Sequence, residues 1–449
     1  MEIAQSEKTC HAESAEVARG GGVFKRCFLV YYVVDNNKIM KRGIENIDLG
    51  DPVPIKIPYG ERKHVTFLLG SGFSVPCGMP TGKQLNDFVL NINNESITFD
   101  FAGKLAISYD GQKYQTGSPY ESCLMFCSEA MKEYSKNHEF DYEQFFDFIS
   151  SEGIYDSLYE KLAKPFLYAF SDYHQLVFNM KTIYTQVIDH ELRKGRKTEI
   201  LEREIATDKF GRYENFVKYL DKLSIDHVVD IFSLNHDLLI ENLPRTNWLQ
   251  HEGISDGFHS YRSPYYGELE CNGHKYDCRL EEYKAYYNTA IRLYKLHGSL
   301  DYLMFKRCDS NGCFWNDKMI KIPYGIGVDK TKKQNKKRLG YIMDWIEYNH
   351  NFLSGTKSKI HHYNDSFYKK LFQRFRHNLN KAECLIVIGY GGRDSGINKY
   401  ILEYFDYHNK PSYIVDPFYS SNEELKQFGV MIGAKPIEKS IEDFQEIMW

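Results

Sequence analysis

The sequence predicts an α/β fold: a doubly wound, Rossmann-like parallel sheet with a large helical insertion and a small N-terminal β appendage. Three observations predict this class. Short apolar runs of strand length recur along the chain and alternate with helix-compatible segments. Glycines or polar residues follow several of these runs, where open α/β sheets place their ligand-binding loops. The stretch at about 118–224 carries only the three- and four-residue apolar spacing of amphipathic helices.

Residues 1–60 form the predicted β-rich appendage, and residues 61–449 form the α/β domain. The first 22 residues are polar and end in a glycine triplet, which favours a flexible segment. The run FLVYYVV at 28–34 is rich in β-branched and aromatic residues, which predicts a strand.

The first loop with a chemical signal is GSGFS at 70–74, directly after the buried-strand run VTFLL. Glycines let the backbone turn sharply and approach a pyrophosphate, and free N–H groups beside a helix N-terminus attract its charge. The loop departs from the dinucleotide pattern G-x-G-x-x-G because position 75 is valine. A plain turn from strand to helix is therefore the alternative.

Four further buried strands are predicted, at 227–234, 292–296, 384–389 and 412–416. Asn235 and Asp237 follow the first of them, and either line a site or form an Asx turn that caps the next helix. His297 follows the second, either as a general base or as a structural histidine. A glycine loop at 389–394 follows the third. Because these loops share one edge of a parallel sheet, their combination favours a nucleotide site.

Composition describes an ordinary soluble protein of 449 residues with a formal net charge of -4 and 42% hydrophobic residues. It excludes a disordered chain, a collagen-like chain and a disulfide scaffold. No apolar run is long enough to span a bilayer, and the N-terminus lacks the order of a signal peptide. We expect ten reduced cysteines and a cytoplasmic protein. The basic run at 330–338 is more typical of a solvated loop than of a phosphate contact.

The motifs GSGFSVPCGMPTG, SLNHDLLIE, KLHGS and VIGYGGRD occur in the order found in the sirtuin-like (silent information regulator two-like) family. More closely, they resemble the bacterial branch of that family that hydrolyses NAD⁺ in anti-phage defence. The resemblance covers the sheet-forming parts of residues 64–449. It implies that residues 61–449 are an NAD⁺-binding catalytic domain.

The resemblance also implies site residues. Asn235 would orient the ribose and a water, with Asp237 nearby, and His297 would lie at the ribose hydroxyls. The implied dinucleotide-binding residues are Gly70, Ser71, Gly72, Phe73 and Ser74 at the diphosphate, Pro80 and Thr81 beside the nicotinamide, Gly389, Tyr390, Gly392 and Asp394 over the adenosine half, and Asp416 after the final predicted strand, at ribose hydroxyls.

The cysteines bear on which reaction is expected. Deacylating sirtuins carry a zinc module of two CxxC pairs, whereas here four residues separate Cys308 from Cys313 and six separate Cys271 from Cys278. These spacings are wider than zinc sites prefer, so no metal is expected. The sequence therefore favours hydrolysis of NAD⁺ to ADP-ribose and nicotinamide. The alternatives are an NAD⁺-dependent protein deacylase or ADP-ribosyltransferase, and a non-catalytic nucleotide-binding scaffold.

The resemblance further implies the toxic effector of an anti-phage system, which depletes NAD⁺ in an abortive infection. Such an activity must be controlled, and we expect a homo-oligomer or a partner protein to do so. The family suggests a HerA-like DNA-translocating ATPase or an Argonaute-like protein as that partner, and no membrane association.

Overall fold

The computed structural model describes residues 8–19, 22–35, 38–41, 59–92, 98–99, 105–106, 119–192, 207–271, 274–309, 312–322, 326–335, 340–342 and 366–449. The chain divides into two compact units, Met1–Ile55 and Lys56–Trp449. The first unit holds an antiparallel sheet of β1 (Lys8–Arg19), β2 (Gly22–Asp35) and β3 (Lys38–Lys41). The expectation of a flexible segment over residues 1–22 is wrong for β1, because its backbone pairs with β2 along its whole length.

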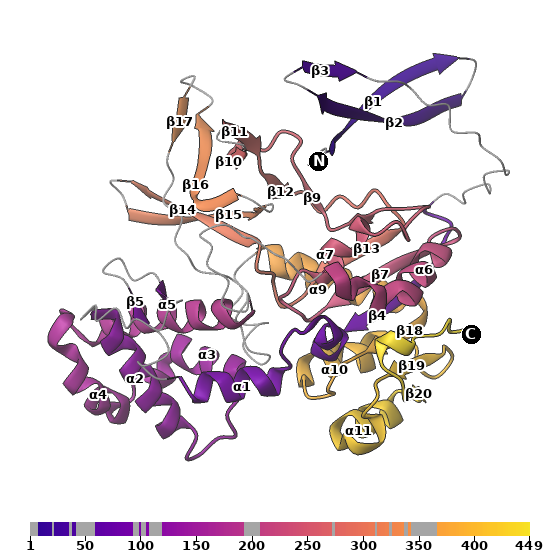
Figure 1. Ribbon diagram of the computed structural model, residues 1–449. Helices are drawn as coiled ribbons and strands as arrows, with labels where there is room; N and C mark the ends of the chain where they lie inside the picture. The colour runs from indigo at the N-terminus through magenta and orange to yellow at the C-terminus, as the bar shows by residue number, and fades with distance from the viewer. Residues whose placement is uncertain are drawn as a thin grey trace, which may run out of the picture. The chain divides into compact units, whose positions relative to one another are not determined.

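The second unit is built on a seven-stranded sheet in the order β20-β19-β18-β4-β7-β13-β8 (Figure 1). Its strands are β4 (Lys63–Leu69), β7 (His227–Ser233), β8 (Ile254–Ser255), β13 (Ile291–Lys295), β18 (Ala382–Ile388), β19 (Ser412–Val415) and β20 (Lys435–Ile437). All neighbouring strands of this sheet run parallel. Apart from β8, the order is that of a Rossmann fold, which confirms the predicted fold class. Sequence analysis missed the edge strand β20, so β19 is not the final strand.

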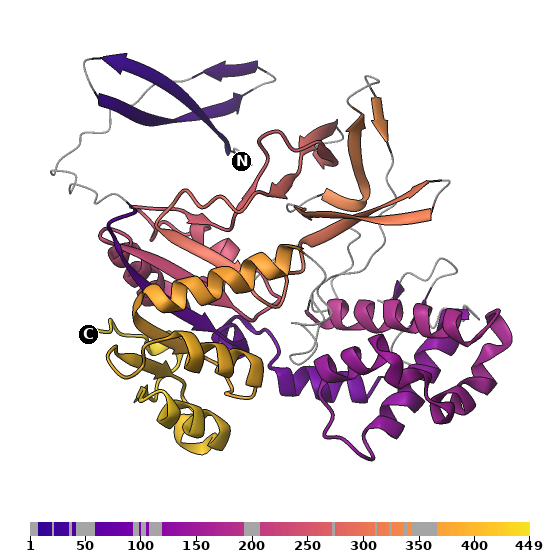
Figure 2. The same ribbon diagram turned by 180° about the vertical axis from the view of Figure 1, so that it is seen from behind.

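Side chains leave the sheet alternately toward two buried layers. On β4, Val65 and Phe67 face one layer, which α6 covers, and Leu68 faces the other. The covering helices are α6 (Glu214–Leu223) on the first face and α9 (Ser366–Lys381), α10 (Ser395–Tyr404) and α11 (Glu423–Met431) on the second. Figure 2 shows α9, in orange, lying against the sheet. Burial on both faces explains why the strands read as unbroken apolar runs.

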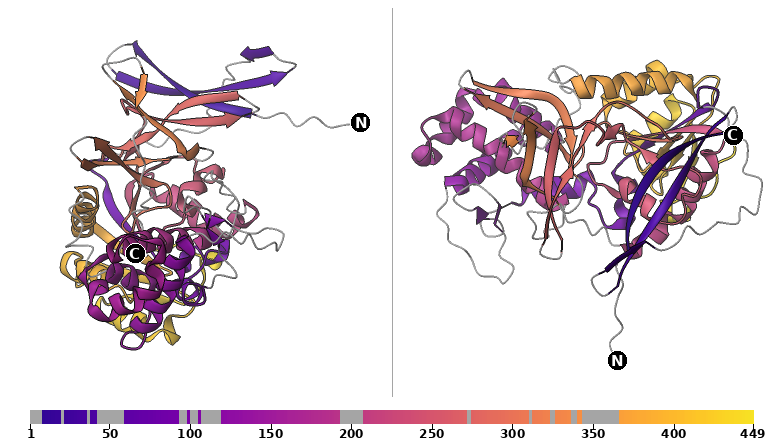
Figure 3. Two further views of the ribbon diagram at one scale, coloured as in Figure 1. Left: turned by 90° about the vertical axis from the view of Figure 1, so that its left-hand side faces the viewer. Right: turned by 90° about the horizontal axis from the view of Figure 1, so that it is seen from above.

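The helical insertion has a hydrophobic core of its own. It comprises α2 (Pro119–Tyr134), α3 (Tyr142–Ser150), α4 (Ser157–Ala163) and α5 (Tyr173–Leu192), with 3₁₀ turns at Glu152–Tyr155 and Lys164–Ala169. Helix α1 (Gly82–Leu90) contributes Leu85 and Val89 to this core. Figure 3 shows the purple helices of the insertion gathered together. Sequence analysis included α6 in the insertion, but α6 packs on the sheet instead.

Two antiparallel sheets, β11-β10-β16-β17 and β14-β15-β12-β9, lie between β8 and α9 in the chain. Their strands are β9 (Phe258–His259), β10 (Tyr265–Cys271), β11 (His274–Arg279), β12 (Glu281–Tyr283), β14 (Tyr302–Asp309), β15 (Gly312–Lys321), β16 (Ile326–Asn335) and β17 (Gly340–Ile342). Sequence analysis predicted none of them, because charged residues interrupt their apolar pattern. The expected solvated loop at 330–338 is wrong for residues 330–335, which belong to β16, and residues 336–338 lie outside the described residues.

The remaining short elements are β5 (Thr98–Phe99), β6 (Leu105–Ala106), α7 (Leu239–Asn242) and 3₁₀ turns at Ser71–Phe73, Val75–Cys77, Thr207–Tyr213, Leu243–Arg245, Tyr419–Ser421 and Ile441–Asp443. Within the described ranges, no helix combines the length and the apolar character needed to cross a membrane.

Thr81 forms a capping box at the start of α1. Its hydroxyl accepts a hydrogen bond from Gln84 N at 3.2 Å, and its own N–H donates to Gln84 Oε1 at 2.8 Å. We expect Thr81→Ala to lower the free energy of unfolding by about 1 kcal/mol in urea titrations, and Thr81→Ser to restore most of it. A variant with unchanged stability would contradict this capping role.

Candidate functional site

The candidate site lies at the carboxyl edge of the parallel sheet. The chain runs from β4 to β7 on one side and later returns to β18 on the other side of β4. The strand order therefore reverses between β4 and β18, and such a switch point opens a crevice for ligands in α/β folds. The loops after these two strands begin at Gly70 and Gly389.

The glycines of these two loops pack directly against each other. Gly70 N donates to Ile388 O at 3.0 Å, and Gly72 N donates to Gly389 O at 2.9 Å. Gly389 has a φ of +61°, and a Cβ on it would lie 2.2 Å from Phe73 N. The expectation that the N–H groups of this loop are free is therefore wrong for Gly70 and Gly72. Glycine is needed here for close contact between loops.

The helix after the glycine loop also differs from expectation. Two 3₁₀ turns, Ser71–Phe73 and Val75–Cys77, follow β4, and α1 begins only at Gly82. Since α1 packs with the insertion and not on the sheet, its N-terminus does not directly extend the loop as in a dinucleotide-binding turn.

Asn235 is fixed by both hydrogens of its side-chain amide. Its Nδ2 donates to Gly70 O at 2.9 Å and to Ser74 Oγ at 3.0 Å. A carbonyl oxygen can only accept, so the Gly70 contact fixes the orientation of the amide and leaves Oδ1 as an acceptor. The residue is 7% exposed and lines a cavity. Ser74 thus holds Asn235 rather than lining the cavity itself.

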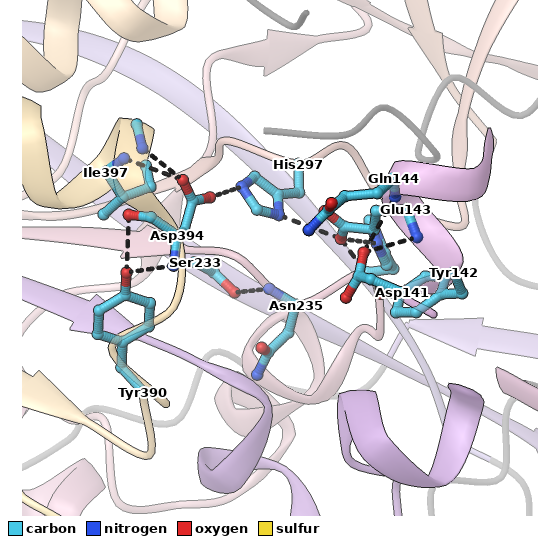
Figure 4. Close-up of polar contacts among 12 residues, drawn as sticks. Asp141, Tyr142, Glu143, Gln144, Ser233, Asn235, His297, Tyr390, Asp394 and Ile397 are labelled. Atoms are coloured by element: carbon cyan, nitrogen blue, oxygen red, sulfur yellow. Dashed lines mark hydrogen bonds and ion pairs between the residues drawn. The ribbon is translucent and has the colours of Figure 1, made fainter. Parts of the chain in front are cut away.

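His297 lies between two carboxylates (Figure 4). Its Nδ1 is 3.5 Å from Glu143 Oε1, and its Nε2 is 3.3 Å from Asp394 Oδ2. The other oxygen of Asp394 caps α10 by accepting from the backbone of Gly396 and Ile397 at 3.0 and 3.1 Å. The histidine is 5% exposed and lines the same cavity as Asn235. The imidazole therefore lies beside the cavity with a carboxylate facing each of its ring nitrogens.

Glu143 comes from α3 of the helical insertion. Asp141 caps that helix by accepting from Glu143 N at 3.1 Å and Gln144 N at 3.0 Å, which fixes where the carboxylate emerges. Glu143 Oε1 also lies 3.6 Å from His236 Nε2. Sequence analysis missed Glu143 and did not include His236 among the site residues, although His236 stands inside a quoted motif. The acidic start of α3 was the one available signal, and many exposed helices share it.

A buried lysine ties two of the site loops together. Lys295 is 1% exposed, and its Nζ donates to Asp237 O and lies 3.5 Å from Glu241 Oε1. Burial raises the pKa of the Glu241 carboxyl, and the nearby Lys295 charge opposes that rise. Leu300 N also donates to His236 O at 3.1 Å. These contacts hold the loop after β7 against the loop after β13.

The cavity measures about 210 Å³. The predicted site residues that line it are Gly70, Ser71, Pro80, Asn235, Asp237, His297, Tyr390 and Asp394. Its other lining residues include Gly391, Arg393, His236 and the start of α3, from Asp141 to Gln144. The cavity thus draws on four strand-end loops and on the insertion.

Other predicted site residues do not line this cavity: Gly72, Phe73, Ser74, Thr81, Gly389, Gly392 and Asp416. The Phe73 ring is buried in the core against Tyr213 and Phe216. The carboxylate of Asp416 accepts from Phe418 N at 2.8 Å, and burial raises its pKa. Asp237, which does line the cavity, accepts from Leu239 N at 2.9 Å, so its side chain forms the expected Asx turn, although the N-cap of α7 is Leu238.

The described residues contain no group of three or more His, Cys, Asp or Glu side chains that could hold a metal ion. In this part of the chain burial raises the pKa of the Cys77, Cys123, Cys127 and Cys384 thiols, to about 12 for Cys123 and Cys384. These thiols are therefore protonated and unreactive at neutral pH.

No protein-family model matches the chain, and no curated protein matches it either. Among solved structures, one match is the crystal structure of a Sir2 homolog–NAD complex. It shares 11% sequence identity, covers 84% of this chain and 90% of that one, and has a TM-score of 0.25. These values are too low to establish a common function. The fold class is established by the order and direction of the strands themselves.

Proposed function

We propose that this protein hydrolyses the N-glycosidic bond of NAD⁺ to give nicotinamide and ADP-ribose. The observation that carries the proposal is the convergence of Asn235 and His297 on one cavity at the switch point of a Rossmann-ordered sheet. Parallel sheets bind nucleotides at such points. The resemblance of the four loop motifs to sirtuin-like NAD⁺ hydrolases supports the same substrate.

The proposed mechanism needs no general acid, because the positively charged nicotinamide of NAD⁺ leaves as a neutral pyridine. The bond from C1′ of the ribose to the pyridine nitrogen breaks, and the oxygen of a water bonds to C1′. The proton of that water passes to Nε2 of His297, whose Nδ1 faces Glu143, and then to solvent. Asn235 would accept a hydrogen bond at Oδ1 from the water or from a ribose hydroxyl, which holds the reacting groups in position.

Arg393 is the proposed contact for the diphosphate. The backbone N–H groups of Gly70 and Gly72 are already bonded, so another donor must meet the phosphate charge. Of the described residues that line the cavity, Arg393 is the only lysine or arginine. Its side chain is 68% exposed, so a ligand can reach it. In the structure its Nη2 lies 3.5 Å from Glu424 Oε1.

We expect Arg393→Ala to weaken NAD⁺ binding about tenfold, the loss of one charge-assisted hydrogen bond. Titration of NAD⁺ followed by calorimetry measures this change. Lys426→Ala, which removes an exposed cation of α11 outside the cavity lining, is the matched control. Equal affinities of the two variants for NAD⁺ would show that Arg393 does not contact the bound dinucleotide.

The proposal extends to a toxic effector in anti-phage defence, kept inactive until a partner or self-assembly activates it. This part rests on the resemblance of the motifs. Co-expression with a HerA-like ATPase or an Argonaute-like protein, followed by measurement of the cellular NAD⁺ pool during infection, tests it. An unchanged NAD⁺ pool in infected cells with each candidate would contradict the defence role.

Product analysis separates the proposed reaction from its alternatives. The purified chain is incubated with NAD⁺, alone and with an acylated peptide, and the products are separated by chromatography. Equal amounts of nicotinamide and ADP-ribose without peptide are the expected result. Nicotinamide release that requires the peptide would indicate a deacylase or an ADP-ribosyltransferase. Binding without turnover, also with the candidate partners present, would indicate a scaffold.

A further inference from the structure

We propose that Glu143 is a positioning residue of the active site, which holds His297 and balances the charge that His297 acquires during turnover. The helical insertion is then a necessary part of the catalytic site and not a separate module. This inference rests on the proposed NAD⁺ hydrolysis, and it assigns a role to a residue that no loop motif contains.

Three polar side chains converge on one oxygen of the Glu143 carboxylate. Glu143 Oε1 lies 3.5 Å from His297 Nδ1 and 3.6 Å from His236 Nε2, and it accepts from Tyr142 Oη at 3.2 Å. The two imidazoles stand on loops after β13 and β7, whereas the carboxylate stands on α3. Elements distant in the sequence thus meet at one oxygen of a residue that lines the cavity, and Figure 4 draws the contact between Glu143 and His297.

The Glu143 carboxylate is largely withdrawn from solvent. The Glu143 side chain is 13% exposed, and the His236 and His297 side chains are 4% and 6% exposed. A carboxylate withdrawn from water to this degree is costly unless donors face it, so its position is coupled to the orientation of both rings. The backbone at Glu143 is fixed as well, because Asp141 caps α3 by accepting hydrogen bonds from the Glu143 and Gln144 N–H groups.

The charge of His297 changes during the proposed reaction. When His297 takes the proton of the attacking water it becomes a cation, and a carboxylate on Nδ1 stabilises that cation. The stabilisation grows only as the proton moves, so it acts on the transition state more than on bound NAD⁺. Asp394 Oδ2 faces Nε2 and contributes from the other side, while Oδ1 of the same carboxylate caps α10. Glu143 therefore contributes mainly to kcat.

The test compares the kinetics of Glu143→Gln with those of the wild-type chain. Glutamine keeps the size of the side chain and removes its charge. We expect kcat for NAD⁺ hydrolysis to fall roughly 100-fold, with KM changed less than about threefold. Glu152→Gln, which removes an exposed carboxylate from the same insertion, should retain wild-type kinetics. Thermal unfolding of both variants checks that the insertion remains folded.

A double-mutant cycle shows whether Glu143 acts through His297. In a His297→Ala background, Glu143→Gln should lower the residual rate less than twofold, because the group it supports is absent. A full 100-fold further loss would mean that Glu143 acts independently, and it would overturn the inference. A wild-type kcat in Glu143→Gln would overturn it as well. A wild-type chain that shows no turnover, also with the candidate partners present, would overturn the proposed function, and this inference with it.

Discussion

Replacing Asn235 with alanine is expected to lower NAD⁺ turnover roughly 100-fold or more, the usual effect of removing one well-placed polar group. The side chain is locked by its bonds to Gly70 O and Ser74 Oγ, so its Oδ1 is held in place before the substrate binds. A preorganised acceptor needs no rearrangement during the reaction, which is why its loss affects the rate strongly. The initial rate of nicotinamide release measures the effect.

The matched control for this variant is Asn242→Ala. Asn242 is 7% exposed, as Asn235 is, and its Nδ2 also bonds to a backbone carbonyl, Leu238 O at 2.8 Å. It does not line the cavity. We expect both variants to lose some stability but only Asn235→Ala to lose turnover. Comparable rates for the two variants, measured on the folded proteins, would show that Asn235 has no role in the chemistry.

The second large effect is expected for Gly389→Ala, which should lower the free energy of unfolding by about 2–5 kcal/mol. Two costs add here. Gly389 has a φ of +61°, which L-residues adopt with difficulty, and its Cβ would lie 2.2 Å from Phe73 N and 2.5 Å from Gly72 C. The atoms in the way are backbone, so they cannot move aside as a side chain can. Urea titration monitored by circular dichroism measures the loss.

Gly391→Ala is the control for this prediction, because a Cβ at Gly391 meets no atom within 4 Å. It should change the free energy of unfolding by less than about 1 kcal/mol. Folded Gly389→Ala protein should also bind NAD⁺ more weakly, since Gly389 packs against the 70–74 loop that holds the Asn235 side chain. A Gly389→Ala variant as stable as Gly391→Ala would contradict the close packing of these loops.

The sequence could predict the parallel sheet because its strands are buried on both faces. VTFLL and CLIVIG contain no charged residue, so their length and composition alone identify them. The antiparallel strands could not be found in the same way. Strand β16 carries KTKKQ, and such a charged stretch is as typical of a loop as of a strand until its pairing partner is known.

The candidate site could be predicted in part for a similar reason. Asn235 and His297 follow predicted strands, and the shared edge of a parallel sheet brings strand ends together. Glu143 lies on a helix whose acidic start any solvent-facing helix could have. Its contact with His297 depends on how the insertion packs, which the local pattern does not encode. The same holds for the bonds that occupy the Gly70 and Gly72 N–H groups.

The location of bound NAD⁺ tests the central claim most directly. A crystal structure of the His297→Ala variant with NAD⁺ would trap the intact substrate, because the proposed base is missing. We predict that the nicotinamide ribose lies within hydrogen-bond distance of Asn235 Oδ1 and that the diphosphate lies beside Arg393. NAD⁺ bound elsewhere on the chain, or with its nicotinamide ribose away from Asn235, would contradict the proposed site and mechanism.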